Sequence, residues 1–313
     1  FETDGTGFSV NCGVKVYGNY SRMQNKKSLS CFFRSEYGAS MLEYPLFGED
    51  GLDTYESFVL RSSGQDAGRA RMRDVLATSL MGDYTDVPVQ DYKPVVVYLN
   101  GEYWGLYYIR EKISEHYLAG HYNTDSDNMK VVFSSGEDKR SYWDLMHYVQ
   151  VNDMRIQEHY DYVCSRMDVD EYIDFIIAQI WVANMDMPGN VKFFLNSNGQ
   201  WTWILFDMDM GFLDYSNDRL GYILLGSDDP HDEYDERTFA VELLANPEFR
   251  DKFLARMAWQ MNTIWSEENV FARIDEIVAQ IEPDMQKETA RWNSSYEAWQ
   301  RHVEQIRDFV RNR

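Results

Sequence analysis

WVANMDMPGNVKFFLNSNGQWTWILFDMDMGF, at residues 181–212, is the stretch that best predicts the fold and the functional site of this chain. Its apolar run at 193–195 and a second, Trp-rich run at 201–206 are typical of β-strands. Between them, Asn-Ser-Asn-Gly at 196–199 forms a turn cluster that tolerates positive φ angles. We therefore expect a β-hairpin near the middle of the chain.

Four polar side chains flank this hairpin: Asp186 and Asn190 before it, Asp207 and Asp209 after it. A hairpin returns the chain to its starting point, so we expect the two pairs to lie side by side. Pro188-Gly189 disfavours a helix and predicts a shaped loop there. Three carboxylates and an amide suit a divalent metal bound to phosphates. The plain alternatives are an acidic turn at a strand end and an Asx turn after a helix.

Length and charge limit the classes of function. The 313 residues fit one large domain or two closely joined lobes. A formal net charge of −22 argues against nucleic acid or an anionic membrane as the main partner, since both require basic surface. The longest apolar run, at 175–182, is too short to cross a membrane. The chain begins at Phe1 rather than Met, so we expect a trimmed or mature fragment.

Three cysteines, Cys12, Cys31 and Cys164, are widely spaced, which excludes a zinc-ribbon pattern. Cys12 and Cys31 fall on neighbouring predicted strands. They could form a disulfide in a secreted protein, although three cysteines do not by themselves indicate the redox compartment.

The first part of the chain has the pattern of a β-rich region. Strands are expected around Val14 and Val16, at 29–33, at 58–60 and at 95–99, with a helix at 70–81. Asn100-Gly101, between two β-favouring runs, is a strong signal for a second hairpin that continues through residue 109.

From Glu111 onward the pattern becomes helical. Asp168 with Glu171 resembles a capping box, and apolar residues then recur at one-face helical spacing up to Trp181. Asn246-Pro247 and Ser266-Glu267 are typical helix starts. We predict an α+β chain with a smaller β-rich N-terminal half, a larger helical C-terminal half and a cleft between them that holds the polar cluster.

A further candidate site lies on the first predicted strands. The turn Gly18-Asn19 could approach phosphates through backbone N–H groups, and a lysine that follows it could neutralise them. Because strand side chains alternate, Lys26 should point outward if Lys27 points inward. The plain alternative is a solvated pair of lysines.

Two other charged residues are candidates for lining the cleft. Arg61 follows the strand at 58–60, and Glu111 ends the second hairpin, where an inter-lobe hinge would lie. Each could instead pair with its neighbours or belong to the charged surface.

At this point the chain resembles the CotH (spore coat protein H) kinase-like family over nearly its whole length. The segments that carry the resemblance occur in the family's order: VYGNYSRMQNKKSLSCFF, LRSSGQD, RMRDVLATSL, PVVVYLNGEYWGLYYIREKI, NMDMPGN, ILFDMDMGF and LLANPEFRDKF. The segment that contains Asn100-Gly101 is the most diagnostic of these.

The resemblance implies an atypical protein-kinase-like fold of two lobes, at about 1–112 and about 113–313, within a single domain over 1–313. It also implies transfer of phosphate from ATP, with Mg²⁺ or Mn²⁺ in the inter-lobe cleft, to Ser or Thr of a partner protein. We expect a bacterial, extracytoplasmic protein that is monomeric and that neither binds nucleic acid nor inserts into a membrane.

The resemblance also implies roles for individual residues. Asp186 would be the catalytic base, Asn190 and Asp207 would hold the metal with Asp209 in support, and Lys27 would contact the phosphates of the cofactor. Gly18, Asn19, Arg61 and Glu111 are further candidates for the cofactor site from their positions in the sequence alone. Some positions depart from the family pattern: no His-Arg precedes Asp186, Val191 and Lys192 follow Asn190, and Met208 and Met210 occupy places where the family tends to carry other residues. None of these departures removes a carboxylate.

Two other classes of function remain open. A non-catalytic surface or coat-type protein could use a degenerate kinase fold as an interaction module, which the acidic and aromatic composition would suit. A carbohydrate-active enzyme could use Asp186 and Asp207 as its two carboxylates, if they flank a sugar groove. An amide beside an Asp-x-Asp pair favours a metal site instead.

Overall fold

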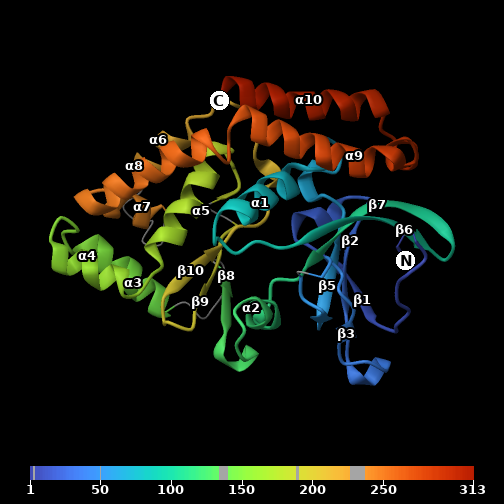
Figure 1. Cartoon of the computed structure of the whole chain (residues 1–313), viewed down its shortest axis with the longest axis horizontal. Coiled ribbons are helices and arrows are strands. Elements are labelled where there is room, and N and C mark those ends of the chain that lie inside the picture. Colours follow the sequence, from blue (N-terminus) through green and yellow to red (C-terminus); the bar gives the residue numbers. More distant parts are fainter. Residues whose placement is uncertain (3, 50, 134–139, 188–189, 226–236) are drawn as a thin grey trace. The chain divides into compact units, whose positions relative to one another are not determined.

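The computed structural model describes residues 1–2, 4–49, 51–133, 140–187, 190–225 and 237–313 (Figure 1). The strand pairs of its three described sheets are antiparallel, and helices make up most of the rest, which confirms the predicted α+β class. The chain forms two compact units, and each combines distant segments. Unit 1 comprises Phe1–Arg71, Gln90–Asn128 and Val278–Trp299, and unit 2 comprises Met72–Val89, Met129–Ile277 and Gln300–Arg313. The two-lobed kinase-like arrangement and its boundary near residue 112 stay predictions.

Unit 1 is built on a five-stranded sheet in the order β1-β2-β5-β7-β6. Its strands are β1 (Gly13–Tyr17), β2 (Ser28–Phe32), β5 (Ser57–Arg61), β6 (Tyr92–Leu99) and β7 (Glu102–Glu111). The unit also contains the short pair β3 (Leu42–Glu43) and β4 (Thr54–Tyr55), the helix α2 (Glu115–His121), and the 3-10 turns η1 (Tyr20–Met23), η2 (Ser35–Tyr37), η3 (Gly64–Asp66) and η4 (Ser126–Asn128). A core cluster of Cys31, Phe33, Leu42, Leu46, Tyr55 and Phe58 packs beneath β2 and β5.

The β6–β7 hairpin forms where the sequence predicts it. Asn100 and Gly101 have φ angles of 52° and 82°. Positive values at both positions give a two-residue turn whose twist matches that of the two strands it joins. The first predicted turn differs from expectation. Gly18 does have a positive φ of 105°, but the chain then forms η1 and reaches β2 only at Ser28, so β1 and β2 are joined by a longer connection.

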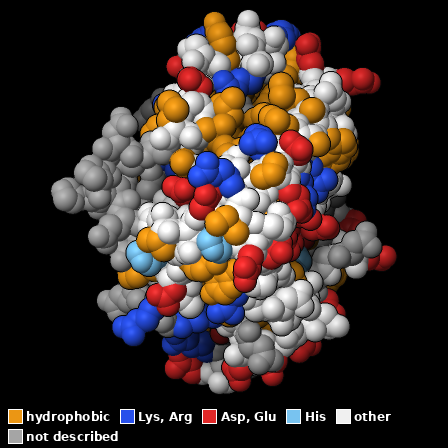
Figure 2. Space-filling view, turned by 90° about the vertical axis from the view of Figure 1, so that its left-hand side faces the viewer, with side chains coloured by type: hydrophobic (Ala, Val, Ile, Leu, Met, Phe, Trp, Pro, Cys, Tyr) orange, Lys and Arg blue, Asp and Glu red, His pale blue; other side chains and the backbone are white. Residues whose placement is uncertain are grey.

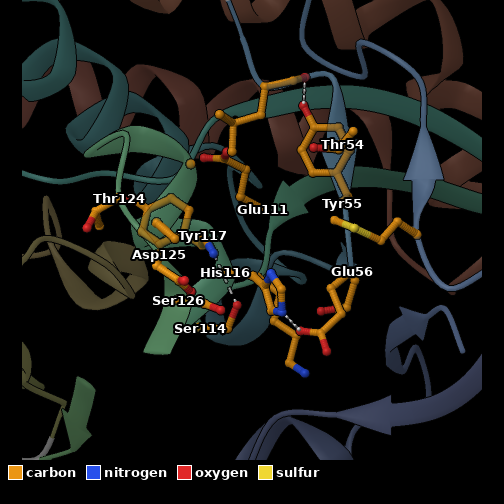
Figure 3. Close-up of a pocket in the computed structure, with 16 residues that line it drawn as sticks. Thr54, Tyr55, Glu56, Glu111, Ser114, His116, Tyr117, Thr124, Asp125 and Ser126 are labelled. Atoms are coloured by element: carbon orange, nitrogen blue, oxygen red, sulfur yellow. Dashed lines mark hydrogen bonds and ion pairs between the residues drawn. The ribbon is translucent and has the colours of Figure 1, made fainter. Parts of the chain in front are cut away.

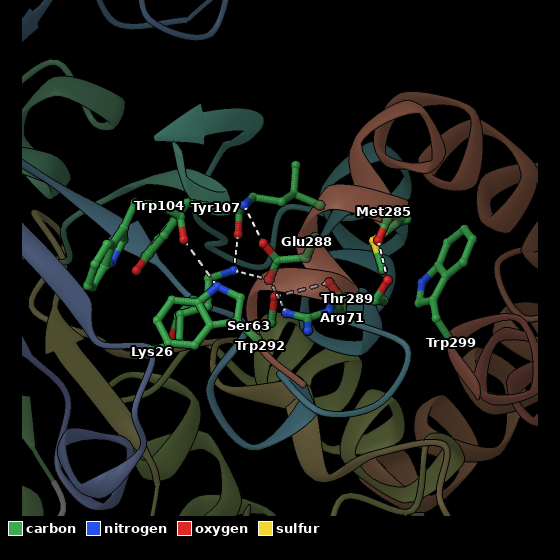
Figure 4. A network of polar contacts seen from close by, with 12 residues as sticks. Lys26, Ser63, Arg71, Trp104, Tyr107, Met285, Glu288, Thr289, Trp292 and Trp299 are labelled. Atoms are coloured by element: carbon green, nitrogen blue, oxygen red, sulfur yellow. Dashed lines mark hydrogen bonds and ion pairs between the residues drawn. The ribbon is translucent and has the colours of Figure 1, made fainter. Parts of the chain in front are cut away.

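One fully buried carboxylate joins three separate segments of unit 1 to helix α9 (Glu267–Arg291) (Figure 4). Oε1 of Glu288 accepts hydrogen bonds from Lys26 Nζ at 2.6 Å and from Arg71 Nη1 at 2.7 Å. Its Oε2 accepts from the backbone N–H of Leu106 at 2.7 Å. A carboxylate removed from water needs this number of partners, because each unmade hydrogen bond would leave charge uncompensated in the interior.

The backbone around this carboxylate is shaped to admit it. Gly105 has a φ of 148°, and a Cβ added there would lie 2.6 Å from Glu288 Oε2 and 2.9 Å from Trp292 Nε1. Any larger residue would therefore push the carboxylate off its donors. Trp292 Nε1 donates to the carbonyl of Trp104 at 3.1 Å, and Trp299 Nε1 donates to the carbonyl of Ala70 at 3.1 Å. These two bonds tie the residues after Glu288 to the same two segments of unit 1 that contain Leu106 and Arg71.

Unit 2 is mainly helical. Its helices are α1 (Arg73–Tyr84), α3 (Arg140–Val151), α4 (Gln157–Cys164), α5 (Val169–Trp181), α6 (Arg219–Leu225), α7 (Thr238–Leu243) and α8 (Pro247–Asn262), together with the first part of α9 and most of α10 (Tyr296–Asn312). A three-stranded sheet in the order β10-β9-β8 completes it, with β8 (Lys130–Phe133), β9 (Lys192–Leu195), β10 (Trp201–Ile204) and the 3-10 turn η6 (Met208–Met210).

Local sequence signals explain where two of these helices begin. The side chain of Asp168 caps α5 by accepting from the N–H of Glu171 at 3.1 Å. Asn246 caps α8 by accepting from Glu248 N at 2.8 Å and Phe249 N at 3.2 Å, with Pro247 in the first turn. Both starts are as predicted.

Helix α5 is buried on nearly all sides, and aromatic rings pack around it. Tyr142 stacks on Phe193 of β9 with ring centroids 3.7 Å apart, and Tyr172 of α5 lies 4.6 Å from Trp203 of β10. Trp181, at the end of α5, stacks on Trp265 at 4.7 Å. These contacts fix the end of α5 and the start of the hairpin, between which the polar cluster lies.

Within the described residues, none of the helices combines the length and the apolar composition that a membrane crossing requires.

Replacing Glu288 with Gln should destabilise unit 1 strongly. The change leaves Lys26 and Arg71 as buried cations without a counter-ion, a loss of about 3–5 kcal/mol in the free energy of unfolding measured in urea. The matched control on the same helix is Glu276→Gln, because Glu276 is 63% exposed and pairs with Arg273 at the surface. The control should change stability by less than about 0.5 kcal/mol. Equal effects of the two substitutions would contradict the assignment.

Lys26 should make stability depend on pH. Burial lowers its pKa from 10.5 to about 8, although Glu288 opposes the shift. Between these values the unfolded chain binds more protons than the folded one, so the free energy of unfolding should rise with pH from about 8 toward 10, by at most about 1.4 kcal/mol per pH unit. The variant Lys26→Met should lose this slope. Urea denaturation of both proteins across this range is the measurement, and parallel curves would show that Lys26 does not titrate as stated.

Candidate active site

The loop after α5 is shaped by one asparagine. The chain leaves the helix through Ala183, whose φ of 53° is in the left-handed region that L-residues seldom adopt. Asn184 is buried, and its Nδ2 donates to Gln179 Oε1 at 2.9 Å. Its Oδ1 accepts from the backbone N–H of Asp186 at 3.2 Å. Asp186 is therefore held in a defined position, although it lies in a loop.

The predicted hairpin follows. β9 and β10 pair antiparallel, with Phe193 opposite Trp203. At the turn, Asn196 Oδ1 accepts from the N–H groups of Asn198 and Gln200, and Gly199 has a φ of 75°. The turn chemistry expected from Asn-Ser-Asn-Gly is confirmed.

After the hairpin, the chain is held by hydrogen bonds to two other elements. Asp207 has φ 58° and ψ 46°, a left-handed conformation that Asp tolerates better than most residues. The next backbone N–H, of Met208, donates to Oδ1 of the buried Asp74 on α1 at 2.9 Å. Phe212 N then donates to the carbonyl of Val182 at 2.7 Å, which returns the chain to the end of α5. Unusual backbone angles thus cluster around the polar residues, as they often do at functional sites.

Three of the four predicted side chains meet directly. Asn190 Nδ2 donates to Asp186 Oδ2 at 2.7 Å and to Asp207 Oδ2 at 2.8 Å. The amide group therefore bridges two carboxylates that are 21 positions apart in sequence. Asp209 lies two residues beyond Asp207 on η6, where it is buried. Pro188-Gly189 lies outside the described residues.

The environment of Asp186 favours a carboxyl group that can accept a proton. Partial burial raises its pKa, the negative charge of Asp207 raises it further, and the hydrogen bond from Asn190 opposes the shift. A carboxylate whose pKa is moved toward neutrality is a better general base than a fully solvated one. The roles of these residues stay predictions.

The donor set at this point fits a hard divalent cation. Among the described residues, no group of three or more His, Cys, Asp or Glu side chains is arranged to hold a metal. Mg²⁺ bound with a nucleotide does not need such a group, because one or two carboxylates, water and phosphate oxygens complete its coordination. The carboxylates of Asp186 and Asp207 accept hydrogen bonds from the same amide nitrogen, so they are close enough to contact one ion together. The residues present could therefore hold such a cation only together with ligands from outside the protein.

The candidates on the first strands are placed in unit 1. Gly18 needs its lack of a side chain, because a Cβ there would lie 2.1 Å from Ser21 Oγ. Its carbonyl accepts from Arg22 Nε, and Asn19 is exposed. Arg61 ends β5 and is half-buried opposite Tyr108.

The two adjacent lysines precede β2 rather than lie in it, so strand alternation does not apply to them, and it is Lys26, not Lys27, that points inward. Lys26 is the buried lysine, and its Nζ donates to Glu288 and to the carbonyl of Leu106. Lys27 is partly exposed, and its Nζ donates to the backbone carbonyl of Arg22. The reason is that the buried carboxylate of Glu288, far along the chain, selects Lys26. The proposed phosphate contact of Lys27 stays a prediction.

Glu111 lies at the wall of a pocket of about 260 Å³ within unit 1 (Figure 3). Its carboxylate is almost fully buried, accepts from Asp91 N at 2.9 Å and pairs with His121 Nε2 at 2.8 Å. Glu56 and His116 also line the pocket, with Glu56 Oε2 3.8 Å from His116 Nε2. These pairings give Glu111 a structural role in holding β7 to α2. A contact between Glu111 and a cofactor stays a prediction.

Some residues that shape the site carry no clear signal in the sequence. Asp74 reads as one member of a surface-like Arg-Asp pair, yet it accepts from Met208 N. Asn184 reads as the end of a helix, yet it positions Asp186. In both cases the partner is decided by tertiary packing.

Comparison with protein-family models matches residues 14–313 to the family described as CotH kinase protein. No curated protein sequence matches the chain.

Replacing Asp207 with Asn should stabilise the protein in the absence of divalent metal. The change removes the repulsion between Asp207 and Asp186, and Asn is well tolerated at a left-handed position. A rise of about 1–3 °C in the thermal midpoint in EDTA is expected. The control is Asp214→Asn, which removes the same charge from an exposed carboxyl group that accepts from Ser216. Its midpoint should stay level or fall. A lower midpoint for Asp207→Asn would contradict the electrostatic argument.

Proposed function

Because the chain belongs to the CotH kinase protein family, we propose that it is an atypical kinase that transfers the γ-phosphate of ATP to Ser or Thr hydroxyls of a partner protein. The family supports a kinase-like protein in general terms. The observation that supports catalysis in this chain is the bridge from the Asn190 amide to Asp186 and Asp207. It brings the side chains proposed here as the base and as metal ligands to one point, as phosphoryl transfer requires.

Each residue of this cluster has a separate proposed task. Asp186 accepts the proton of the substrate hydroxyl as its oxygen bonds to the γ-phosphorus and the bond to the β–γ bridging oxygen breaks, releasing ADP. Asn190 and Asp207 hold Mg²⁺ or Mn²⁺, with Asp209 in support. The bound ion supplies positive charge that offsets the charge of the phosphate oxygens. To bind the ion, the amide group of Asn190 would rotate so that its Oδ1, rather than its Nδ2, faces the ion.

The position of the nucleotide is proposed from the remaining residues. Lys27 would contact phosphate, the turn at Gly18-Asn19 would offer backbone N–H groups, and Arg61 and Glu111 would line the nucleotide site. Lys26 is buried and pairs with Glu288. We also propose a two-lobed kinase-like arrangement, a monomeric state and a location at a bacterial surface or coat, which suits a family named after a spore coat protein.

An interaction module is the second candidate function. It is supported by exposed apolar side chains on two helices of unit 2: Leu220, Tyr222 and Leu225 on α6, and Leu254, Trp259 and Met261 on α8. Figure 2, which faces the helices at the left of Figure 1, shows hydrophobic side chains gathered in its upper half among charged ones. Exposed apolar groups of this kind often mark protein-binding surfaces. A protein kinase also needs such a surface for its substrate, so the two candidates differ in nucleotide binding.

The carbohydrate-active alternative fits the site less well. Two catalytic carboxylates of a glycosidase flank the sugar and leave room for it or for a water molecule. Here Asp186 and Asp207 both point at the amide nitrogen of Asn190.

The Asp207→Ala variant tests the proposal. The purified parent should show a higher thermal midpoint with ATP and Mn²⁺ or Mg²⁺ than with ATP alone, because a ligand that binds only the folded state stabilises it. The variant should lose the metal-dependent rise and at least about 100-fold of phosphotransfer to a protein acceptor, while it stays folded. Asp214→Ala is the matched control for loss of an exposed carboxylate and should keep both properties.

Two results would decide against the kinase. Full phosphotransfer by Asp207→Ala would remove the metal role. If millimolar ATP with metal leaves the parent's midpoint unchanged and a protein partner raises it, the interaction module is the better description.

A further inference from the structure

Two cysteines of unit 1 are in contact at the open end of its first strand pair. In the β1–β2 register, Cys31 lies opposite Val14, which places Cys12 one diagonal step away on the neighbouring chain segment. Cys12 lies near enough to Cys31 to raise the pKa of the Cys31 thiol. Cys12 also packs against the core cluster that contains Cys31. Both cysteines are thiols in this structure.

The strand that Cys12 precedes is weakly anchored. β1 is the edge strand of the five-stranded sheet and pairs with β2 alone. None of its five residues is buried, and Val14 and Val16 are 56% and 45% exposed. An edge strand that buries so little apolar surface depends largely on its pairing with β2, so a covalent link at this point would change its stability more than elsewhere in the sheet.

We propose that Cys12 and Cys31 form an intrachain disulfide when the folded protein meets a disulfide oxidant such as oxidised glutathione. The Cys12 thiolate attacks one sulfur of the oxidant, forms a mixed disulfide and releases one glutathione. The Cys31 thiol then loses its proton and attacks the Cys12 sulfur, which releases the second glutathione. Two protein thiols are oxidised, one oxidant disulfide is reduced, and the two thiol protons end on the two glutathione molecules.

The environment of the two thiols sets this order. Cys12 is partly exposed and can reach the oxidant, whereas Cys31 is buried. Burial raises the pKa of Cys31 to about 12, and the neighbouring Cys12 adds to the shift. Cys31 is therefore a poor first nucleophile but is placed to act on a mixed disulfide next to it. Because the reduced form gains no stabilised thiolate, the pair has the character of a structural disulfide rather than a catalytic one.

The disulfide would close a loop that contains the whole β1–β2 connection. Gly18, Asn19, Lys26 and Lys27 all lie between the two cysteines in sequence. Closing the loop reduces the conformational freedom of the unfolded chain and holds β1 on β2 in the folded one. The inference does not depend on phosphotransfer, so it can fail or succeed independently of the proposed function.

The experiment uses the full chain, treated with oxidised glutathione in its native state, then digested without reduction and examined by mass spectrometry. The expected result is a linked pair of peptides that contain Cys12 and Cys31, with Cys164 left as a free or glutathione-bearing residue. The Cys164→Ser variant should give the same linked pair, and Cys12→Ser should give none. Because the link is mapped in the parent, the result does not depend on whether a Cys31 variant folds.

Hydrogen exchange measures the consequence. In the oxidised protein, amides of β1 should exchange more slowly by roughly tenfold or more, and the thermal midpoint should rise on the order of 5 °C, both reversed by a reductant. Glutathione on Cys12 without the linked peptides, or linked peptides only after unfolding, would overturn the proposal. A linked pair with unchanged exchange in β1 would overturn its stabilising role.

Discussion

The carboxylate of Glu288 is the contact on which unit 1 depends. It joins the segment before β2, the end of the segment that precedes α1, and strand β7 to a helix near the other end of the chain. A buried anion is costly unless every oxygen is satisfied, so this one position constrains many others. Gly105 must lack a side chain, Lys26 must point inward, and Trp292 must close the site from one side.

The polar cluster of unit 2 applies the same physical rule with a different outcome. Asp186 and Asp207 would repel each other, and the Asn190 amide offsets this by donating to both. Unlike Glu288, these carboxylates are partly exposed, so their hydrogen-bond partners can be exchanged for others. Ala183 and Asp207 have left-handed backbone conformations, which cost free energy in L-residues. Hydrogen bonds from neighbouring elements to the adjoining backbone offset this cost. A rigid scaffold with exchangeable charge partners is what a phosphoryl-transfer site needs.

The contrast between Lys26 and Lys27 shows why local patterns do not identify a ligand. The sequence analysis treats both lysines as part of a strand, but they lie just before β2, and Lys26 is the one that is buried. Which of the two is buried depends on where a carboxylate 262 positions further along the chain is placed. The same applies to Asp74, whose partner Met208 lies 134 positions away. Sequence reasoning detects the need for a partner but not its identity.

The sequence by itself determined the local elements and one long-range contact. The Asn100-Gly101 and 196–199 turns, the caps at Asp168 and Asn246, and the α+β class all follow from backbone preferences that act within a few residues. The meeting of Asp186, Asn190 and Asp207 was also predictable, because a hairpin brings its two ends together. Tertiary structure alone decided the buried ion network around Glu288, the pairing of Glu111 with His121 and the orientation of the two lysines. Those depend on how distant segments share one interior, where the cost of an unpaired charge selects the partners.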